Sequence, residues 1–99
     1  MRKTKIKTTR WDSAEYLKTD EDIRLYLEAC FDEAGDDAAF IAHAFGVVAR
    51  ARGMMQLAKE TGLSREALYR GLSEEGNPTL DTLMKVSRAL GLKLTVAHA

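Results

Sequence analysis

Two short helical segments joined at a glycine constrain the fold of this chain more than any other feature of its sequence. They lie in Met54 to Leu72, MMQLAKETGLSREALYRGL, with Gly62 between the two halves. Glycine adopts positive φ at no steric cost, so the chain can turn sharply at this residue. Ala58, four residues earlier, is small enough to let the following helix pack closely across the first. The pattern is typical of a helix-turn-helix.

The second helix of this motif is expected to present its large polar side chains to solvent. Its inner positions share a core with the first helix, through Leu57, Leu63, Leu68 and Leu72. The outer positions are Arg65, Glu66, Tyr69, Arg70 and Ser73. Arginine can reach guanine edges or phosphates, and tyrosine can contact phosphate or a thymine methyl group. The alternative is an ordinary solvated helix with an internal Glu66–Arg70 pair, but the turn before it favours DNA binding.

Further DNA contacts are expected where helices begin. Backbone amides at the starts of helices 54–61 and 79–90 point toward positions that phosphates can occupy. The candidate side chains at helix starts are Gln56, Ser64, Asn77 and Thr79. Ser64 and Thr79 are also expected to cap the helices that follow them.

The rest of the chain is interpreted as a series of helices, which predicts an all-α domain of five to six helices. The expected helices cover residues 12–17, 19 or 20 to 34, 38–52, 54–61, 64 to about 75, and 79–90. Glycines at 35, 53, 62 and 91 end four of them. Residues 38–52 are apolar nearly all round, which is typical of a central buried helix.

Two of the outer helices carry an apolar stripe at helical spacing. In the helix that ends at Ala34 the stripe consists of Ile23, Tyr26, Leu27, Cys30, Phe31 and Ala34. In the last helix it consists of Leu80, Leu83, Met84, Val86, Ser87 and Leu90. The methionines are interpreted as core residues, with an exposed Met55 at a partner surface as the alternative.

Residues 92–97 alternate apolar and polar side chains, which predicts a short C-terminal β-strand. A lone strand leaves its backbone groups unpaired, so it needs a partner. We expect it to pair with its own copy across a two-fold axis, with Leu92, Leu94 and Val96 on one face. The alternatives are pairing with residues 5–7 or a free tail.

The net charge of zero conceals a strong segregation of charge along the chain. Residues 1–10 hold five basic and no acidic side chains, residues 11–37 have a net charge of −8, and residues 38–99 have a net charge of +3. This division predicts a basic flexible tail over 1–10, an acidic helical extension over 11–35 and a helix-turn-helix domain over 36–99. The tail is either solvated or a contact to a polyanion.

The composition argues against an enzyme, a cofactor site and a membrane protein. The chain has 99 residues and one cysteine, so it forms no internal disulfide. His43 and His98 have no partners at metal-ligand spacing, and Cys30 is expected in the core. No apolar run approaches the roughly 20 residues of a membrane span. We therefore expect a soluble, reduced, cytoplasmic protein with no catalytic residues, no metal and no cofactor.

Residues 53–91 resemble the Xre-type, lambda-repressor-like helix-turn-helix, and most of residues 12–96 resembles the probable addiction module antidote proteins, which are antitoxins of that class. The resemblance is carried by Gly53, Leu57-Ala58-x-x-Thr61-Gly62-Leu63-Ser64-Arg65-Glu66-Ala67-Leu68-Tyr69, Gly76-Asn77-Pro78-Thr79-Leu80-x-Thr82-Leu83 and Ala89-Leu90-Gly91-Leu92-Lys93-Leu94. Gly71 departs from the general pattern, which often has a branched apolar residue there. The resemblance implies an antitoxin that binds a RelE/ParE-type toxin and represses its own operon by binding double-stranded operator DNA as a homodimer.

Such toxins are commonly basic, so the acidic extension is the expected toxin contact. The candidate residues are Trp11, Glu15, Asp20, Glu21 and Asp22. The alternative for the three consecutive acids is that they stabilise the positive end of their helix. Two alternatives remain for the whole protein: a toxin-binding module that does not bind DNA, and a plain transcriptional regulator that does not bind a toxin.

Overall fold

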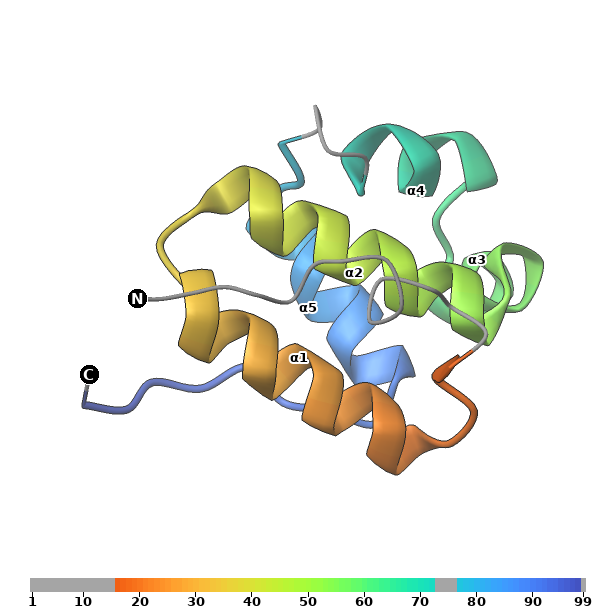
Figure 1. The fold of residues 1–99 in the computed structure, drawn as a ribbon. Helices are drawn as coiled ribbons and strands as arrows, with labels where there is room; N and C mark the ends of the chain where they lie inside the picture. Colours follow the sequence, from red (N-terminus) through yellow and green to blue (C-terminus); the bar gives the residue numbers. More distant parts are fainter. Residues whose placement is uncertain (1–15, 73–76, 99) are drawn as a thin grey trace.

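The computed structural model describes residues 16–72 and 77–98, and this part of the chain is all-helical (Figure 1). Its helices are α1 (Asp20–Ala34), α2 (Ala38–Arg52), α3 (Met54–Thr61), α4 (Arg65–Gly71) and α5 (Leu80–Ala89). Among them, none combines the length and apolar character needed to cross a membrane. The predicted basic tail over 1–10 lies outside the described residues.

Helix α2 is the centre of the fold, as its apolar sequence predicts. Its buried positions run almost without a break from Ile41 to Ala49. Figure 1 shows α1 on one side of α2 and α4 on the other. Helix α3 contacts α2, α4 and α5, so it ties the second half of the chain to the central helix. One hydrophobic core therefore holds all five helices together.

Side-chain caps set the starts of four helices. Thr19 forms a capping box with Asp22, in which each side chain accepts a hydrogen bond from the other residue's backbone N–H. Asp37 accepts from Phe40 N, Ser64 from Ala67 N and Thr79 from Thr82 N. The predicted starts of α1, α2, α4 and α5 are thus confirmed. In each helix a backbone N–H of the first turn donates to the side chain of the residue just before the helix.

The turn between α3 and α4 has the geometry that its glycine predicts. Gly62 lies in the left-handed region at φ 79°, and its N–H donates to the carbonyl of Ala58. The Thr61 hydroxyl accepts from Leu63 N, which ties the turn together. Ser64 then caps α4, which begins at Arg65, so only three residues separate the two helices.

Helix α4 is shorter than predicted. It ends at Gly71, with Leu72 as its C-cap, whereas the sequence suggested continuation to about residue 75. Glycine disfavours helix, which agrees with an end at Gly71. The rest of the predicted helix, residues 73–75, lies outside the described residues. Of the expected helix over 12–17, only the last two residues are among those described, and Leu17 is buried in the core.

The predicted C-terminal strand is not formed in the described residues. The backbone N–H of Leu92 donates to the carbonyl of Ser87, which fixes the start of this segment against α5. Residues 92–98 then continue without regular structure, because one copy of the chain offers them no partner strand among the described residues. In a single copy of the chain Leu92 is half-buried whereas Val96 is 95% exposed, and their contact with a second copy stays a prediction.

Both predicted apolar stripes are only partly covered. Ile23, Tyr26, Leu27 and Cys30 are buried on α1, whereas Phe31 is 42% exposed. On α5, Val86 and Ser87 are buried, and Leu90, its C-cap, is buried too. The exposed apolar side chains of α3 and α5 are Met55, Leu80 and Met84. The interpretation of Met55 and Met84 as core residues is therefore wrong, because no neighbouring element in the described part of the chain covers these faces.

Candidate functional site

Helix α4 presents a polar surface of four exposed side chains. Leu68 is fully buried and anchors the helix to the core, and Leu72 is buried directly after it. The exposed positions are Arg65, Glu66, Tyr69 and Arg70. Tyr69 is 55% exposed, so its ring as well as its hydroxyl is accessible. The predicted division into inner and outer residues is thus confirmed for Leu68, Leu72 and the four exposed side chains, and Ala67, which was also expected to face inward, is half-buried.

The predicted contacts at helix starts have distinct local roles. The Ser64 and Thr79 hydroxyls each accept a backbone N–H as N-caps. The Thr79 hydroxyl also donates to Thr82 Oγ1 at 3.2 Å. Asn77 is exposed just before α5. Ser73, the last predicted position of the α4 surface, lies outside the described residues.

Gln56 is exposed on α3, but its amide is already engaged by a neighbouring side chain. Its Nε2 donates to Glu60 Oε2 at 2.8 Å. Glu60 also pairs with Arg52 at 3.2 Å, and Arg52 lies 3.6 Å from Asp20. This chain of polar contacts connects the start of α1 with the end of α2 and with α3. A phosphate contact by Gln56 would have to compete with Glu60.

The three consecutive acids at the start of α1 have structural partners. Asp22 completes the capping box, Asp20 lies near Arg52, and Glu21 pairs with Arg24. The hydrogen bond from Arg24, and then its positive charge, hold the pKa of Glu21 below its ordinary value of 4.5. The same pair raises the pKa of Arg24. Trp11 and Glu15, the other predicted toxin contacts, lie outside the described residues.

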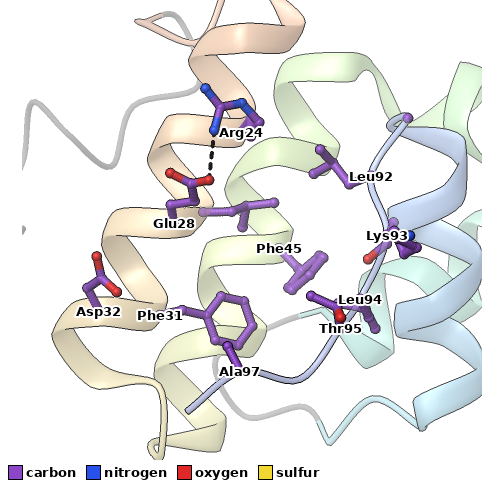
Figure 2. A pocket seen from close by; sticks show the side chains of 13 residues that line it. Arg24, Glu28, Phe31, Asp32, Phe45, Leu92, Lys93, Leu94, Thr95 and Ala97 are labelled. Atoms are coloured by element: carbon purple, nitrogen blue, oxygen red, sulfur yellow. Dashed lines mark hydrogen bonds and ion pairs between the residues drawn. The ribbon is translucent and has the colours of Figure 1, made fainter. Parts of the chain in front are cut away.

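A groove between α1 and residues 92–97 was not predicted from the sequence. It has a volume of about 680 Å³, and its apolar lining includes Leu27, Phe31, Phe45, Leu92 and Leu94. Figure 2 shows Phe31 pointing from α1 toward the C-terminal segment, with the Arg24–Glu28 ion pair along the same helix. Phe31 and Phe45 meet edge to face, with ring centroids 6.4 Å apart. The signal in the sequence was Phe31, which stands at the end of its stripe.

The described residues include no group of three or more His, Cys, Asp or Glu side chains able to hold a metal ion. Cys30 is fully buried on α1, which confirms its predicted place in the core. The described surface carries a mixed-charge face on α4 and an apolar groove beside α1.

The described residues define a small all-helical fold with a polar face on α4 and an apolar groove beside α1. Comparison of the sequence with models of known protein families identifies the family of this chain. The sequence model of the probable addiction module antidote proteins matches residues 7–98. A protein of Haemophilus influenzae, described as uncharacterized, is 48% identical over 89 residues, which is 90% of each chain. The chain belongs to the family of probable addiction module antidote proteins, and the antidote function implies a toxin as its partner.

No solved structure matches the chain at a significant level.

Proposed function

We propose that this protein is an antitoxin that binds a RelE/ParE-type toxin and represses its own operon by binding double-stranded DNA through α4. In this proposal the protein acts by contact alone, as a cytoplasmic homodimer without catalytic residues. The α3–α4 pair is a helix-turn-helix of the Xre type, and α4 enters the major groove.

The exposed surface of α4 is the observation that carries the DNA-binding part. Arg65 and Arg70 are exposed on a short helix that is anchored by the buried Leu68. An arginine presented from a fixed helix can donate two hydrogen bonds to a guanine edge or pair with a phosphate. Tyr69 adds an exposed aromatic group between them. This composition supports contact with a nucleic acid better than a merely solvated helix does.

The starts of α3 and α5 support the same docking. Helix α3 has no side-chain cap on its first amides, because Gly53 precedes it. Such amides are ready donors for a phosphate oxygen. Asn77 and Thr79 lie at the start of α5, where they can contact the backbone of the same DNA segment.

A homodimer supplies the second half of the proposed interface. Two copies of α4 would read successive major grooves about 34 Å apart, as a two-fold symmetric operator requires. The exposed segment that contains Leu94 and Val96 is the candidate dimer contact, together with Leu92 at its base. Within the described residues its backbone forms no strand, so it remains able to pair with a second copy.

A toxin-binding module without DNA binding is the second candidate. It is favoured by the composition of α1, which carries six acidic side chains and one basic one. An acidic helix suits a basic toxin and needs no operator. The α4 surface would then be an ordinary solvated face.

Binding of the full-length protein to its own upstream DNA separates the two candidates. The measurement is fluorescence anisotropy with the upstream fragment and with a scrambled fragment of equal length and composition. Repressor function predicts tighter binding to the upstream fragment by about 10³-fold or more. Equal affinity for the two fragments would contradict it and favour the toxin-binding module.

A further inference from the structure

We infer that two copies of this protein associate through a two-fold contact along α5, in which the α5 helices run antiparallel and Met84 lies near the axis. The inference rests on the homodimer of the proposed function and specifies its surface. It places the centre of the contact on a helix, with residues 92–96 at its edge. A second copy is the occupant, because this surface complements itself in both shape and charge.

The surface is a continuous apolar patch that α5 shares with the C-terminal segment. Leu80 and Met84 lie one turn apart on α5 and are 67% and 45% exposed. Leu94 lines one pocket together with Met84, and it lines a second pocket together with Leu80 and Val96. The four side chains are therefore neighbours. Apolar side chains scattered singly are normal on a surface, whereas a contiguous group of them indicates contact with another molecule.

The patch contains both an exposed side chain and a pocket able to receive it. The exposed side chain is Leu80, four residues before Met84. The pocket is centred on residues after Met84, so the two features lie on either side of it, each about 6 Å along the helix. A two-fold axis close to Met84 brings Leu80 of each copy to the pocket of the other. This pocket has a volume of about 300 Å³ and is lined by Met84, Arg88, Leu92, Lys93 and Leu94.

The charged side chains around the patch are divided between its two ends. Asp81 lies at the start of α5, and Asp36 lines the second pocket at the same end. Arg88 and Lys93 line the first pocket at the other end. Asp81 pairs with Lys85 at 3.1 Å, and the other three form no ion pair within the described part of the chain. An antiparallel second copy sets the acidic end of one patch against the basic end of the other.

Other occupants do not match both ends of the patch. DNA is negative along its whole length, so it would oppose the acidic end. A basic protein segment would oppose the end that contains Arg88 and Lys93. A second copy is complementary at both ends, because a two-fold axis interchanges them.

The test measures self-association of the full-length protein and of two matched pairs of variants. Met84→Glu places two like charges near the axis, and Met55→Glu is its control, an exposed methionine on α3 that lines neither pocket. Arg88→Glu reverses a base in the last turn of α5, and Lys59→Glu makes the matching change in the last turn of α3. Sedimentation velocity over a micromolar concentration range measures association, and circular dichroism melting measures folding. DNA is left out, because the patch begins beside the proposed DNA contacts of α5.

A cross-linking experiment tests the symmetry of the contact. A residue near a two-fold axis faces its own copy, so Met84→Cys should form an interchain disulfide under mild oxidation, and Met55→Cys should not. The native Cys30 is buried and does not compete. Non-reducing electrophoresis measures the cross-linked fraction, and equal fractions in the two variants would overturn the antiparallel arrangement.

We expect Met84→Glu and Arg88→Glu each to weaken self-association by about tenfold or more, and the two controls to associate like the wild type. A folded Met84→Glu variant that associates as tightly as the wild type would overturn the inference while leaving the homodimer in place. Equal weakening by the controls would also overturn it, because the effect would then not be specific to α5. A wild-type protein that stays monomeric would overturn the inference and the proposed homodimer together.

Discussion

Gly46 on α2 lies directly against the main-chain carbonyl of Leu72, the residue that ends α4. A Cβ atom at Gly46 would overlap that carbonyl oxygen, and backbone atoms cannot rotate away as a side-chain end can. Because Gly46 has no side chain, the C-terminal end of α4 can pack directly against the backbone of α2. The orientation of the proposed DNA-contacting helix depends on a glycine in a different helix, 26 positions earlier in the chain.

Gly46→Ala is expected to destabilise the protein although alanine is the better helix former. Overpacking in a close-packed core costs about 1–3 kcal/mol, which exceeds the gain in helix propensity. Urea unfolding followed by circular dichroism measures the free energy of unfolding. A variant as stable as the wild type would show that α4 is not held against Gly46.

Gly71→Ala is the matched substitution and is expected to act in the opposite direction. Among the described residues outside its own helix, the nearest neighbour of a Cβ atom there would be Pro78 at 3.7 Å, an ordinary contact. Alanine should then stabilise the last turn of α4 by up to about 1 kcal/mol. The same unfolding measurement checks this, and a decrease in stability would mean that the fold requires glycine at position 71.

Val96→Asp tests the proposed dimer contact without disturbing the core. Val96 is 95% exposed in one copy, so the folded monomer should tolerate the change. If the C-terminal segments of two copies meet, a buried aspartate in that interface is costly, and the dimer should dissociate. Sedimentation velocity at micromolar concentration measures this. His98→Asp, near the end of the described chain, is the control for the added charge, and an unchanged dimer in Val96→Asp would place the interface on the helices.

Glu21→Gln is expected to lower stability in a pH-dependent way. Because Arg24 lowers the pKa of Glu21 in the folded protein, this ion pair contributes its stability above the ordinary pKa of 4.5. That contribution fades as the pH falls through the lowered pKa. The difference in melting temperature between wild type and Glu21→Gln should therefore be present at pH 7 and shrink in acid. In an Arg24→Gln background the pH-dependent difference should be clearly smaller, with a remainder from the charge of Glu21 at the positive end of α1. An undiminished difference there would contradict the assigned pair.

The sequence alone predicts most helix boundaries, because the signals that set them are local. Thr19, Asp37, Ser64 and Thr79 each cap the helix that they precede in the sequence. Gly62 likewise adopts the left-handed conformation that its position in the turn suggests. The inner and outer positions of α4 follow from helical periodicity in the same way.

The features that the sequence did not predict all depend on interactions between distant segments. Helix α4 stops early where Leu72 meets Gly46. Phe31 and Met84 fit the apolar stripes of their helices, yet both are exposed. Periodicity predicts which side of a helix is apolar, but not how far a neighbouring helix covers that side. The alternation over residues 92–97 indicates a strand, but a strand needs a second strand to pair with. The described residues of a single copy contain no such second strand. The groove follows from these same interactions, so it too required the structure.

The central claim is that α4 contacts operator DNA, and the affinity of one double variant tests it most directly. The α4 double variant, Arg65→Ala with Arg70→Ala, removes two cations from the α4 surface. The control double variant, Lys18→Ala with Arg24→Ala, removes one cation just before α1 and one on α1. Titration of the upstream fragment at fixed salt should show binding by the α4 variant weakened by about 1–3 kcal/mol for each arginine that touches a base, and the α1 control close to the wild type. An α4 double variant that remains folded and binds the fragment with wild-type affinity would contradict the claim.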